Sequence, residues 1–437
     1  MKISVIGCGY LGAVHAASMA KLGHEVIGID TDAAKIADLS SGRAPFFEPG
    51  LPELLLDSLE SGRLRFSTDM AEVQSSQVHF ICVGTPQKPG EYAADVQYVD
   101  AAFNALMPFL QPGSIAVGKS TVPVGTAARI AEKIAIEAPN SSLIWNPEFL
   151  REGHAVKDTL SPDRFVYGTS SHSQAPKAIA ILDDVYALAI SVGTPRLVVD
   201  FATAELVKSA ANSFLATKIS FINAMAEVCE AAGADVTLLA DAIGMDERIG
   251  RKFLNAGIGF GGGCLPKDIR AFMARAGELG ADQALTFLRE VDTINMRRRT
   301  KVVERTRDLC DGSLIGKRIT VLGATFKPNS DDVRDSPSLS IAAQLQLQGA
   351  AVTVTDPEGL ANAAKRFPEL KYEPDVMKAL KNANAVLLLT EWDEFTALDA
   401  SAIGCLVAEK RIFDGRNILE PRKWRSEGWT YAGIGRP

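Results

Sequence analysis

A single cysteine ends a glycine-rich stretch, GFGGGCLPKD, at residues 259–268. Cys264 precedes a helical pattern that we expect Asp268 to cap. A thiol beside a helix N-terminus, with Lys267 next to it, is favoured as the thiolate, which is the nucleophilic form. The ordinary alternative is a buried structural cysteine in a flexible turn. The adjacent charges, and glycines that let backbone approach a ligand closely, favour a reactive thiol.

A second chemical signature, GCGYLG at 7–12, follows an apolar strand pattern and opens a helical one. In the dinucleotide fingerprint, Gly7 permits the tight turn, Gly9 admits the pyrophosphate, and Gly12 lets the helix pack closely on the strand. The next predicted strand ends at Asp30, which would bind ribose hydroxyls and repel a 2′-phosphate. We therefore predict NAD as the cofactor; a Rossmann unit without a cofactor is the alternative.

Polar residues follow several further strands of the first half. We predict these strands at 78–83, 114–118, 143–145, 165–168 and 196–199. Thr85, Thr121, Glu148 and Glu152 come after the first three of them. Ligands of open parallel sheets bind beyond the carboxyl ends of the strands. Each residue alone is ordinarily a loop or cap residue, but the four together indicate a site.

Two long helical patterns occupy the middle of the chain. The first, at 201–232, carries Lys208 and Asn212 four residues apart, and so on one face. Apolar neighbours would partly desolvate Lys208 and suit it as a base or an electrostatic clamp, whereas a surface lysine is the alternative. The second, from about 283 to 310, contains three arginines at 297–299, for which we expect a solvated face or an interface. Such helices are natural dimerisation surfaces, and we predict a homodimer.

An α/β pattern restarts near residue 315 without a second GxGxxG motif. Its strands are predicted at 318–323, 351–357, 385–390 and 411–416. Lys327, Arg334 and Arg416 lie at strand ends or in their loops, where basic residues suit a phosphorylated ligand. The predicted fold is therefore α/β, with two Rossmann-like doubly wound sheets joined by a long central helical region.

Composition limits the class of protein. The 437 residues are too many for one ordinary core, and 47% hydrophobic with 23% charged residues is typical of a globular protein. A net charge of −7 without a basic cluster argues against a nucleic-acid partner. No apolar run is long enough for a membrane, and no signal peptide precedes the first strand. Six cysteines without metal-type spacing indicate free thiols, no metal site and a cytoplasmic location.

With these motifs assembled, the chain resembles the UDP-glucose/GDP-mannose dehydrogenase family from end to end. The matching segments are GCGYLG at 7–12, FFEPGL at 46–51, VGTP at 83–86, KSTVPVG at 119–125, NPEFLREG at 146–153, AELVKSAANSFLATKISFIN at 204–223, DERIGRKFLNAGIGFGGGCLPKD at 246–268, FKPNSDDVRDSP at 326–337 and FDGRNI at 413–418. Two positions depart from the family pattern: Gly263 stands for a usual Ser and Leu265 for a usual Phe. Both line the cysteine loop and could tune substrate fit.

The resemblance implies a four-electron oxidation of an alcohol to a carboxylate by two NAD in turn. Reaching an acid requires a nucleophile, and Cys264 would form a thiohemiacetal and then a thioester. Lys208 would stabilise the oxyanion, with Asn212 as a second donor. Asp268, through a water and shared with Lys208, is the candidate base. Glu148, oriented by Thr121, would activate the hydrolytic water.

The resemblance also implies two sets of contacts and three regions. The cofactor set is Gly7, Gly9, Tyr10, Leu11, Gly12, Asp30, Lys35, Thr85, Thr121, Glu152, Lys267 and Arg334. The substrate set is Glu148, Phe149, Leu150, Arg151, Glu152, Lys208, Asn212, Arg248, Phe253, Leu254, Asn255, Ala256, Gly257, Gly261, Phe326, Lys327 and Arg416. Either Arg248 or Arg416 could come from a neighbouring subunit. The expected regions are an NAD-binding domain at 1–199, a helical dimerisation and catalytic region at 200–310, and a UDP-sugar-binding domain at 311–437.

The substrate most consistent with FLNAGIGFGG and FFEPGL is UDP-glucose, with GDP-mannose or a UDP-N-acetylhexosamine as alternatives. A two-electron β-hydroxyacid dehydrogenase would explain Lys208 and Asn212, but it would leave Cys264 and the C-terminal sheet without a role. A protein that merely binds NAD or a nucleotide sugar would leave the charged residues around the thiol unused.

Overall fold

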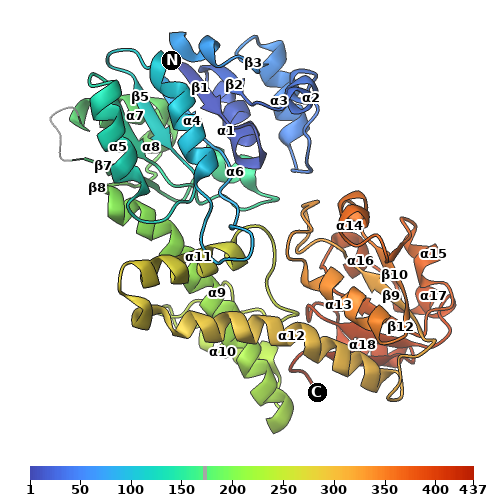
Figure 1. The fold of residues 1–437 in the computed structure, drawn as a ribbon. Coiled ribbons are helices and arrows are strands. Elements are labelled where there is room, and N and C mark those ends of the chain that lie inside the picture. The colour runs from blue at the N-terminus through green and yellow to red at the C-terminus, as the bar shows by residue number, and fades with distance from the viewer. Residues whose placement is uncertain (171–174) are drawn as a thin grey trace. The chain divides into compact units, whose positions relative to one another are not determined.

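Two sheets with the same strand order organise the chain. The computed structural model describes residues 1–170 and 175–437. One sheet has the order β3-β2-β1-β4-β5-β6-β7-β8, and the other has the order β11-β10-β9-β12-β13-β14 (Figure 1). Counted within each sheet, the first six strands follow 3-2-1-4-5-6, the doubly wound order of dinucleotide-binding folds. The predicted class, two Rossmann-like α/β sheets with long central helices, is confirmed.

The inner strands of the first sheet are apolar on both faces, whereas its edge strand β8 is mostly exposed. Its strands are β1 Lys2–Ile6, β2 Glu25–Ile29, β3 Leu64–Ser67, β4 Val78–Ile81, β5 Ile115–Gly118, β6 Ser142–Trp145, β7 Phe165–Thr169 and β8 Arg196–Asp200. Its helices are α1 Tyr10–Lys21, α2 Ala33–Ser40, α3 Leu51–Glu60, α4 Gln97–Leu106, α5 Thr126–Glu137, α6 Ala155–Leu160, α7 Ala175–Val185 and α8 Ala187–Ser191, with short 3-10 helices at Met70–Ser75 and Met107–Phe109. Within β1, Ile3 and Val5 belong to the core on one face and Ile6 to the core on the other. Burial on both faces explains the nearly continuous apolar runs of these strands.

The second sheet is parallel throughout its described pairs. Its strands are β9 Arg318–Leu322, β10 Ala351–Thr355, β11 Lys371–Tyr372, β12 Ala385–Leu388, β13 Arg411–Asp414 and β14 Thr430–Gly433. Its helices are α13 Pro337–Leu347, α14 Leu360–Arg366, α15 Val376–Leu380, α16 Asp393–Thr396, α17 Ala400–Gly404 and α18 Pro421–Ser426. The two outermost strands, β11 and β14, were not predicted, because one has two residues and the other lacks an apolar run.

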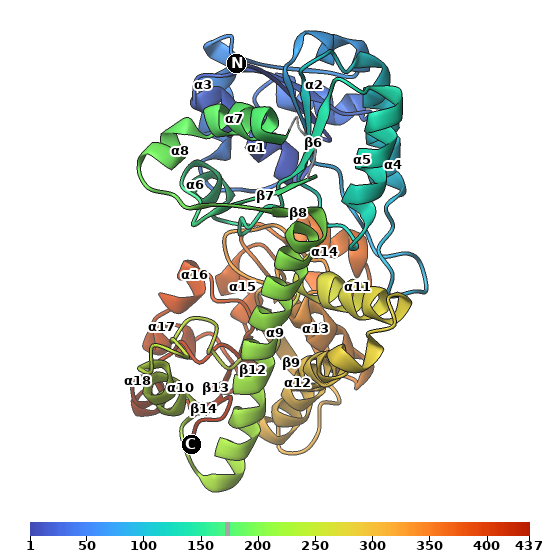
Figure 2. The ribbon, with the colours of Figure 1, turned by 90° about the vertical axis from the view of Figure 1, so that its left-hand side faces the viewer.

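The central helices are α9 Phe201–Ala232, α10 Val236–Gly244, α11 Leu265–Glu278 and α12 Phe287–Leu309, with a 3-10 helix at Asp282–Leu285 before α12 (Figure 2). The bounds of α9 agree with the predicted 201–232. Contacts group the chain into two compact units, 1–211 with 270–280 and 212–269 with 281–437. The segment predicted as a central region is thus shared between the two units, and we describe each unit by itself.

The arginine run of α12 differs from its prediction. Arg298 and Arg299 are 2% and 4% exposed, whereas only Arg297 has a substantially exposed side chain. Arg299 is paired with Asp335 at 2.9 Å. The expectation of a solvated face was therefore wrong for two of the three arginines, because they face the interior of their own unit.

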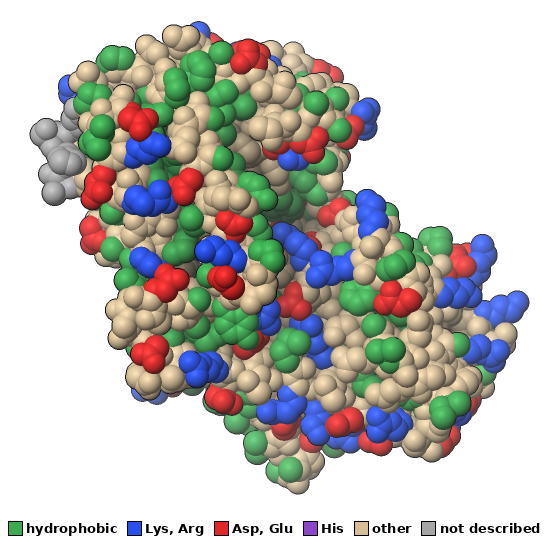
Figure 3. All heavy atoms as spheres, in the orientation of Figure 1, with side chains coloured by type: hydrophobic (Ala, Val, Ile, Leu, Met, Phe, Trp, Pro, Cys, Tyr) green, Lys and Arg blue, Asp and Glu red, His purple; other side chains and the backbone are tan. Residues whose placement is uncertain are grey.

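Charges of both signs lie on the face of the molecule drawn in Figure 3. Lys and Arg side chains are interspersed there with Asp and Glu. Among the described residues, no helix has the length and apolar character needed to cross a bilayer, and no three His, Cys, Asp or Glu side chains gather as metal ligands.

The first turn of each sheet is built in the same way. Gly7 and Gly323 have φ angles of +90° and +111°, and their N–H groups each donate to the carbonyl of the second strand at 2.8 Å. Asp30 and Asp356 each accept the next backbone N–H, from Cys8 at 2.8 Å and from Ala324 at 2.7 Å. The two halves therefore share one strand–turn–helix device, in which an aspartate after the second strand fixes the turn after the first.

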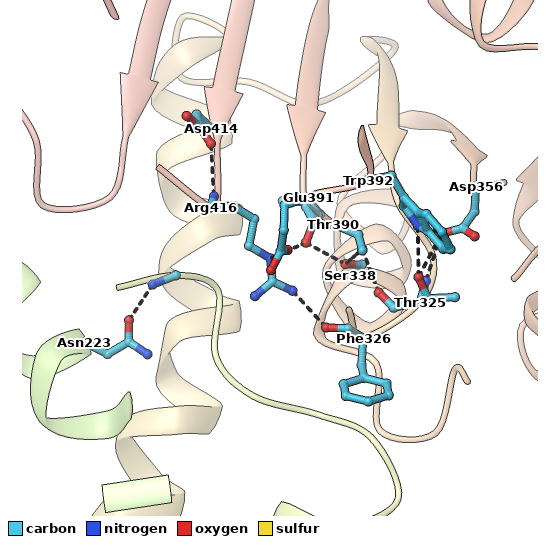
Figure 4. A network of polar contacts seen from close by, with 12 residues as sticks. Asn223, Thr325, Phe326, Ser338, Asp356, Thr390, Glu391, Trp392, Asp414 and Arg416 are labelled. Carbon is cyan, nitrogen blue, oxygen red and sulfur yellow. Dashed lines mark hydrogen bonds and ion pairs between the residues drawn. The ribbon is translucent and has the colours of Figure 1, made fainter. Parts of the chain in front are cut away.

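The two aspartates differ in burial and in the number of protein donors that they bind. Asp356 is 3% exposed and also accepts from Gly359 N at 2.7 Å, Thr325 N at 3.1 Å and Trp392 Nε1 at 3.1 Å (Figure 4). Asp30 remains partly exposed. Asp356 therefore serves as the structural centre of the second sheet's loops.

We expect Asp356→Ala to lower the free energy of unfolding by at least about 3 kcal/mol, since several buried donors would lose their acceptor. Asp375→Ala is the matched control, because Asp375 accepts from Met377 and Lys378 at an exposed helix start. Loss of such an exposed cap costs about 1 kcal/mol. Urea unfolding measures both, and equal losses would contradict the assignment.

Candidate active site

Of the three glycines in the GCGYLG turn, only Gly9 has empty space where a side chain would lie. A Cβ at Gly7 would lie 2.7 Å from Val83 Cγ1, and one at Gly12 would lie 1.8 Å from the Gly7 carbonyl oxygen. Both glycines are therefore required by the packing of the chain itself. A Cβ at Gly9 would meet no atom within 4 Å, and Gly9 stands at the N-terminus of α1. An open backbone there fits a bound pyrophosphate.

Four of the predicted cofactor residues contact one another in pairs. Lys35 Nζ donates to Asp30 Oδ2 at 2.8 Å. Thr85 Oγ1 donates to the Thr121 carbonyl at 2.8 Å. The first pair lies beyond β2, and the second joins the loops after β4 and β5. Asp30, Thr85 and Thr121 are thus at the carboxyl edge of the first sheet, as predicted, and Lys35 reaches Asp30 from α2.

Glu148 and Lys208 form a mostly buried ion pair. Lys208 Nζ lies 3.1 Å from Glu148 Oε1, and the two side chains are 6% and 14% exposed. Leu150 N donates to Glu148 Oε2 at 2.7 Å, and the Phe149 ring lies 5.7 Å from the ammonium. The alternative of a surface lysine is excluded. A lysine and a carboxylate held together in this way can stabilise an oxyanion and accept a proton from water.

Arg151, which the resemblance places in the substrate set, is engaged elsewhere. Its guanidinium donates to both carboxylate oxygens of Asp158, at 2.8 and 2.7 Å. Glu152 follows it on the same loop and is half-buried.

A buried carboxylate that sequence reasoning missed holds this loop. Glu48 is 2% exposed and accepts from the Tyr10 hydroxyl, from Gly153 N at 2.7 Å and from Ala155 N at 2.7 Å. Burial and Glu48 raise the pKa of the Tyr10 hydroxyl. Glu48 thus joins the cofactor turn to the end of the loop that carries Glu148. Its place in the FFEPGL segment was the available signal.

Lys119, in the KSTVPVG segment, was also not predicted as a site residue. It is 7% exposed, and its ammonium donates to Asn146 Oδ1 at 3.2 Å. Burial lowers the pKa of Lys119. Asn146 in turn accepts from the Tyr186 hydroxyl and donates to the Val166 carbonyl, both at 3.0 Å. The pair fixes the ends of β5 and β6, from which Thr121 and Glu148 extend.

Glu205 ties α9 to the loop of Thr121. It is 2% exposed and accepts from Gly125 N and Ala127 N, both at 2.7 Å, at the start of α5. Arg275 donates to the Val124 carbonyl at 2.9 Å on the same turn. Burial raises the pKa of Glu205 to about 7, against the lowering effect of its backbone donors.

This pKa gives a stability prediction with a definite sign. A carboxyl whose pKa is higher in the folded state contributes stability at low pH and loses it as the pH rises through the folded value. We expect the unfolding free energy of the wild type, relative to Glu205→Gln, to fall by roughly 2 kcal/mol between pH 5 and pH 8. Denaturant unfolding at each pH measures it. The exposed Glu132→Gln should show no such trend, and a constant or rising difference for Glu205→Gln would contradict the assignment.

In the second unit, three of the predicted catalytic residues, Asn212, Cys264 and Asp268, lie together at the start of α11. Asp268 is 3% exposed and accepts from Asn212 Nδ2 and from Lys267 Nζ, both at 2.6 Å. Asp268 N donates to the Cys264 carbonyl at 2.9 Å, so α11 begins directly after the cysteine. The cap prediction for Asp268 was therefore wrong: its carboxylate lies within the first turn and binds side chains. Cys264 itself is exposed.

The glycines before Cys264 face the chain itself. A Cβ at Gly261 would lie 2.4 Å from the Asp335 carbonyl oxygen, and one at Gly262 would lie 2.8 Å from the Phe326 ring. A Cβ at Gly263, the position of the expected Ser, would lie 2.3 Å from the Arg334 guanidinium. Protein atoms therefore fill the space beside these three glycines, which is a packing reason for glycine at each position. The expected approach of a ligand to their backbone stays a prediction. Arg334 also donates to Asp332 through Nε and Nη2.

The predicted substrate segment 253–257 is held between α9 and the end of β13. Leu254 and Ala256 are buried, whereas Phe253 is 38% exposed and has a φ of +65°. Gly257 N donates to Asn223 Oδ1 at 2.8 Å, and a Cβ there would lie 3.3 Å from the Gly415 carbonyl oxygen. Asn255 Oδ1 accepts from Arg251 at 2.7 Å.

Arg416 is fixed beside that segment. Its guanidinium donates to the Leu389 and Phe326 carbonyls at 2.7 and 3.1 Å, and it lies 3.0 Å from Glu391 (Figure 4). The Lys327 ammonium lies 5.3 Å from the Phe326 ring. The structure thus gathers predicted substrate residues from three distant segments of the second unit: 253–257, 326–327 and Arg416.

Arg248 does not join this group. Its side chain is 88% exposed, and its guanidinium binds Asp246, two residues away. Its predicted role in substrate binding therefore stays a prediction.

Comparisons with known proteins agree with this geometry. Models of the UDP-glucose/GDP-mannose dehydrogenase family match the chain in three parts: the NAD binding domain at 1–190, the central domain at 202–297 and the UDP binding domain at 320–421. The fold and site define an NAD-dependent dehydrogenase. More narrowly, the chain belongs to the UDP-glucose/GDP-mannose dehydrogenase family.

The relatives cover the whole chain. It is 41% identical to a UDP-glucose 6-dehydrogenase of Rhizobium meliloti, over all of both sequences. A solved UDP-glucose dehydrogenase from Pyrobaculum islandicum is 37% identical, with a TM-score of 0.89 over 100% of this chain and 98% of that one. A UDP-D-ManNAc dehydrogenase from Pyrococcus horikoshii is 26% identical, with a TM-score of 0.86 over 100% and 99%.

Proposed function

We propose that this chain oxidises UDP-glucose to UDP-glucuronate, consuming two NAD per turnover through a covalent intermediate on Cys264. The observation that carries the proposal is the arrangement at the start of α11. An exposed thiol there is followed, within one turn, by a buried carboxylate that Asn212 and Lys267 hold. The identity to UDP-glucose 6-dehydrogenases supports the choice of substrate.

The first oxidation converts the C6 alcohol to an aldehyde. NAD, when bound, accepts a hydride in each of the two oxidations. Asp268 receives the hydroxyl proton through a water, and its two donors, Asn212 and Lys267, orient the carboxylate. Gly9, Asp30 and Thr85 are the residues that would hold the cofactor.

The second oxidation needs a tetrahedral carbon that still carries hydrogen. The Cys264 thiolate adds to the aldehyde carbon and forms a thiohemiacetal, whose oxyanion Lys208 stabilises. Loss of hydride from that carbon gives a thioester. Glu148 then accepts a proton from water, which attacks the thioester and releases the carboxylate and the thiol. Lys208 and Glu148 form one ion pair, so one contact serves both steps.

A two-electron β-hydroxyacid dehydrogenase accounts for Lys208 and Asn212 but gives Cys264 no role. A binding protein gives no role to the ion pair of Glu148 and Lys208 either. GDP-mannose and UDP-N-acetylhexosamines share the chemistry, and the 26% identical structure is that of a UDP-D-ManNAc dehydrogenase. Incubation of the protein with NAD and each nucleotide sugar in turn separates these substrates.

We expect Cys264→Ser to lower the rate of uronate formation at least about a thousandfold, because serine hydroxyl is a far weaker nucleophile for the aldehyde. Chromatography of the nucleotide products measures the acid. Cys405→Ser is the matched control, since Cys405 is the other exposed cysteine of the described chain. Acid formation by Cys264→Ser at the wild-type rate would contradict the covalent mechanism.

A homodimer through α9 is part of the proposal. Phe214, Phe221 and Val228 are 67%, 48% and 57% exposed, and their seven-residue spacing puts them on one face of α9. An exposed apolar stripe of this kind is typical of a protein interface. A second copy could also supply Arg248, whose side chain is free of its own unit's substrate segment. We place the protein in the cytoplasm, where its free cysteines would stay reduced.

Phe221→Glu should shift the protein from dimer to monomer at micromolar concentration, because a carboxylate would be buried without a partner. Light scattering after size-exclusion chromatography measures the mass. Ile136→Glu is the control, as Ile136 is 80% exposed on α5. A wild-type monomer, or a Phe221→Glu dimer as stable as the wild type, would contradict the interface.

A further inference from the structure

A buried asparagine on α12 grips the backbone of the cysteine loop. Asn295 is 0% exposed, and its Oδ1 accepts from Phe260 N at 2.7 Å while its Nδ2 donates to the Phe260 carbonyl at 3.0 Å. One side-chain amide therefore satisfies both polar groups of one loop residue, as a neighbouring β-strand would. Phe260 itself is buried, four positions before Cys264.

A glycine in the loop leaves room for the Asn295 amide. Gly259 has a φ of +100°, and a Cβ there would lie 2.7 Å from Asn295 Oδ1. A side chain at 259 would therefore displace the amide. The three glycines that follow Phe260 have the greatest backbone freedom of any residue type, so the loop needs an external constraint to have one conformation.

The next turn of α12 constrains the same loop indirectly, through residues 334 and 335. Arg299, one turn after Asn295, donates to the Asp335 carbonyl at 3.3 Å and pairs with the Asp335 carboxylate at 2.9 Å. The neighbouring Arg334 carbonyl accepts from Gly262 N at 2.9 Å. The cysteine loop is thus held at Phe260 by Asn295 directly, and at Gly262 through the segment that Arg299 fixes.

We propose that Asn295 is a positioning residue for Cys264, which sets the thiol at the start of α11 by holding Phe260. This inference rests on the proposed role of Cys264 as the nucleophile. Asn295 contacts neither substrate nor cofactor in this account; it acts through the three glycines that separate Phe260 from Cys264. Removal of the amide should slow the chemical steps while leaving the cofactor turn and the segment 253–257 in place.

The experiment measures kcat, KM and the alkylation rate of Cys264 in the full-length protein. Iodoacetamide labelling with peptide mass spectrometry gives the Cys264 rate relative to the exposed Cys405 of the same chain. For Asn295→Leu we expect kcat to fall at least about tenfold, with KM for NAD and for UDP-glucose within about threefold. The Cys264 to Cys405 ratio should fall at least about threefold, because a loosened loop no longer keeps the thiol at the helix N-terminus.

A second variant keeps the proposal testable if leucine disturbs folding. In Asn295→Asp, a protonated carboxyl can both donate and accept, as the amide does, whereas the ionised form cannot donate. Burial favours the protonated form. The kcat of Asn295→Asp, relative to wild type, should therefore be near one at pH 6 and fall at least about threefold by pH 9.

Ser220→Ala is the stability control. Ser220 is 1% exposed and donates to the Val291 carbonyl at 2.7 Å, so this variant loses a buried bond between α9 and α12 without touching the loop. It should leave kcat and the labelling ratio unchanged. The inference is overturned if folded Asn295→Leu, or Asn295→Asp at pH 9, keeps a wild-type kcat and labelling ratio. If instead Cys264→Ser still forms the acid normally, the proposed function fails. The labelling ratio of Asn295→Leu still tests whether the hydrogen bonds from Asn295 to Phe260 position the thiol.

Discussion

Buried carboxylates that collect N–H donors are the constraint on which this structure depends. A carboxylate away from water is tolerated only where donors surround it, so each one fixes the segments that supply those donors. Glu48 fixes the end of the Glu148 loop, and Glu205 fixes the start of α5. Asp268 and Asp356 do the same in the second unit. The candidate active site is therefore positioned by a few charges with several hydrogen bonds each.

Local patterns were sufficient for much of the fold and for part of the site. The turn at 7–12 with Asp30 defined the first nucleotide-binding unit, and α9 has the bounds that its periodicity predicted. Lys208 could be placed on α9 from spacing alone. Such features depend on residues close together in the sequence, where geometry follows from helix and strand periods.

The contacts that fix the site were beyond those patterns because they join distant segments. Glu48 reaches Gly153 across 105 positions, and Asn295 reaches Phe260 across 35. The glycine loop shows the difference most clearly. Its glycines were interpreted only through ligand approach, and the structure adds a packing reason, since a Cβ at Gly263 would meet the Arg334 guanidinium. At the position where the resemblance led us to expect Ser, the missing Cβ leaves space for an arginine, and a local pattern does not identify the neighbour that fills it.

The central claim is that the thiol beside Asp268 carries an aldehyde through a second oxidation. The amount of NADH formed per UDP-glucose consumed tests that claim most directly, with absorbance for NADH and chromatography for the sugar nucleotide. The account predicts two NADH for each UDP-glucose, with UDP-glucuronate as the product. One NADH for each sugar nucleotide, with an aldehyde as the end product, would contradict it.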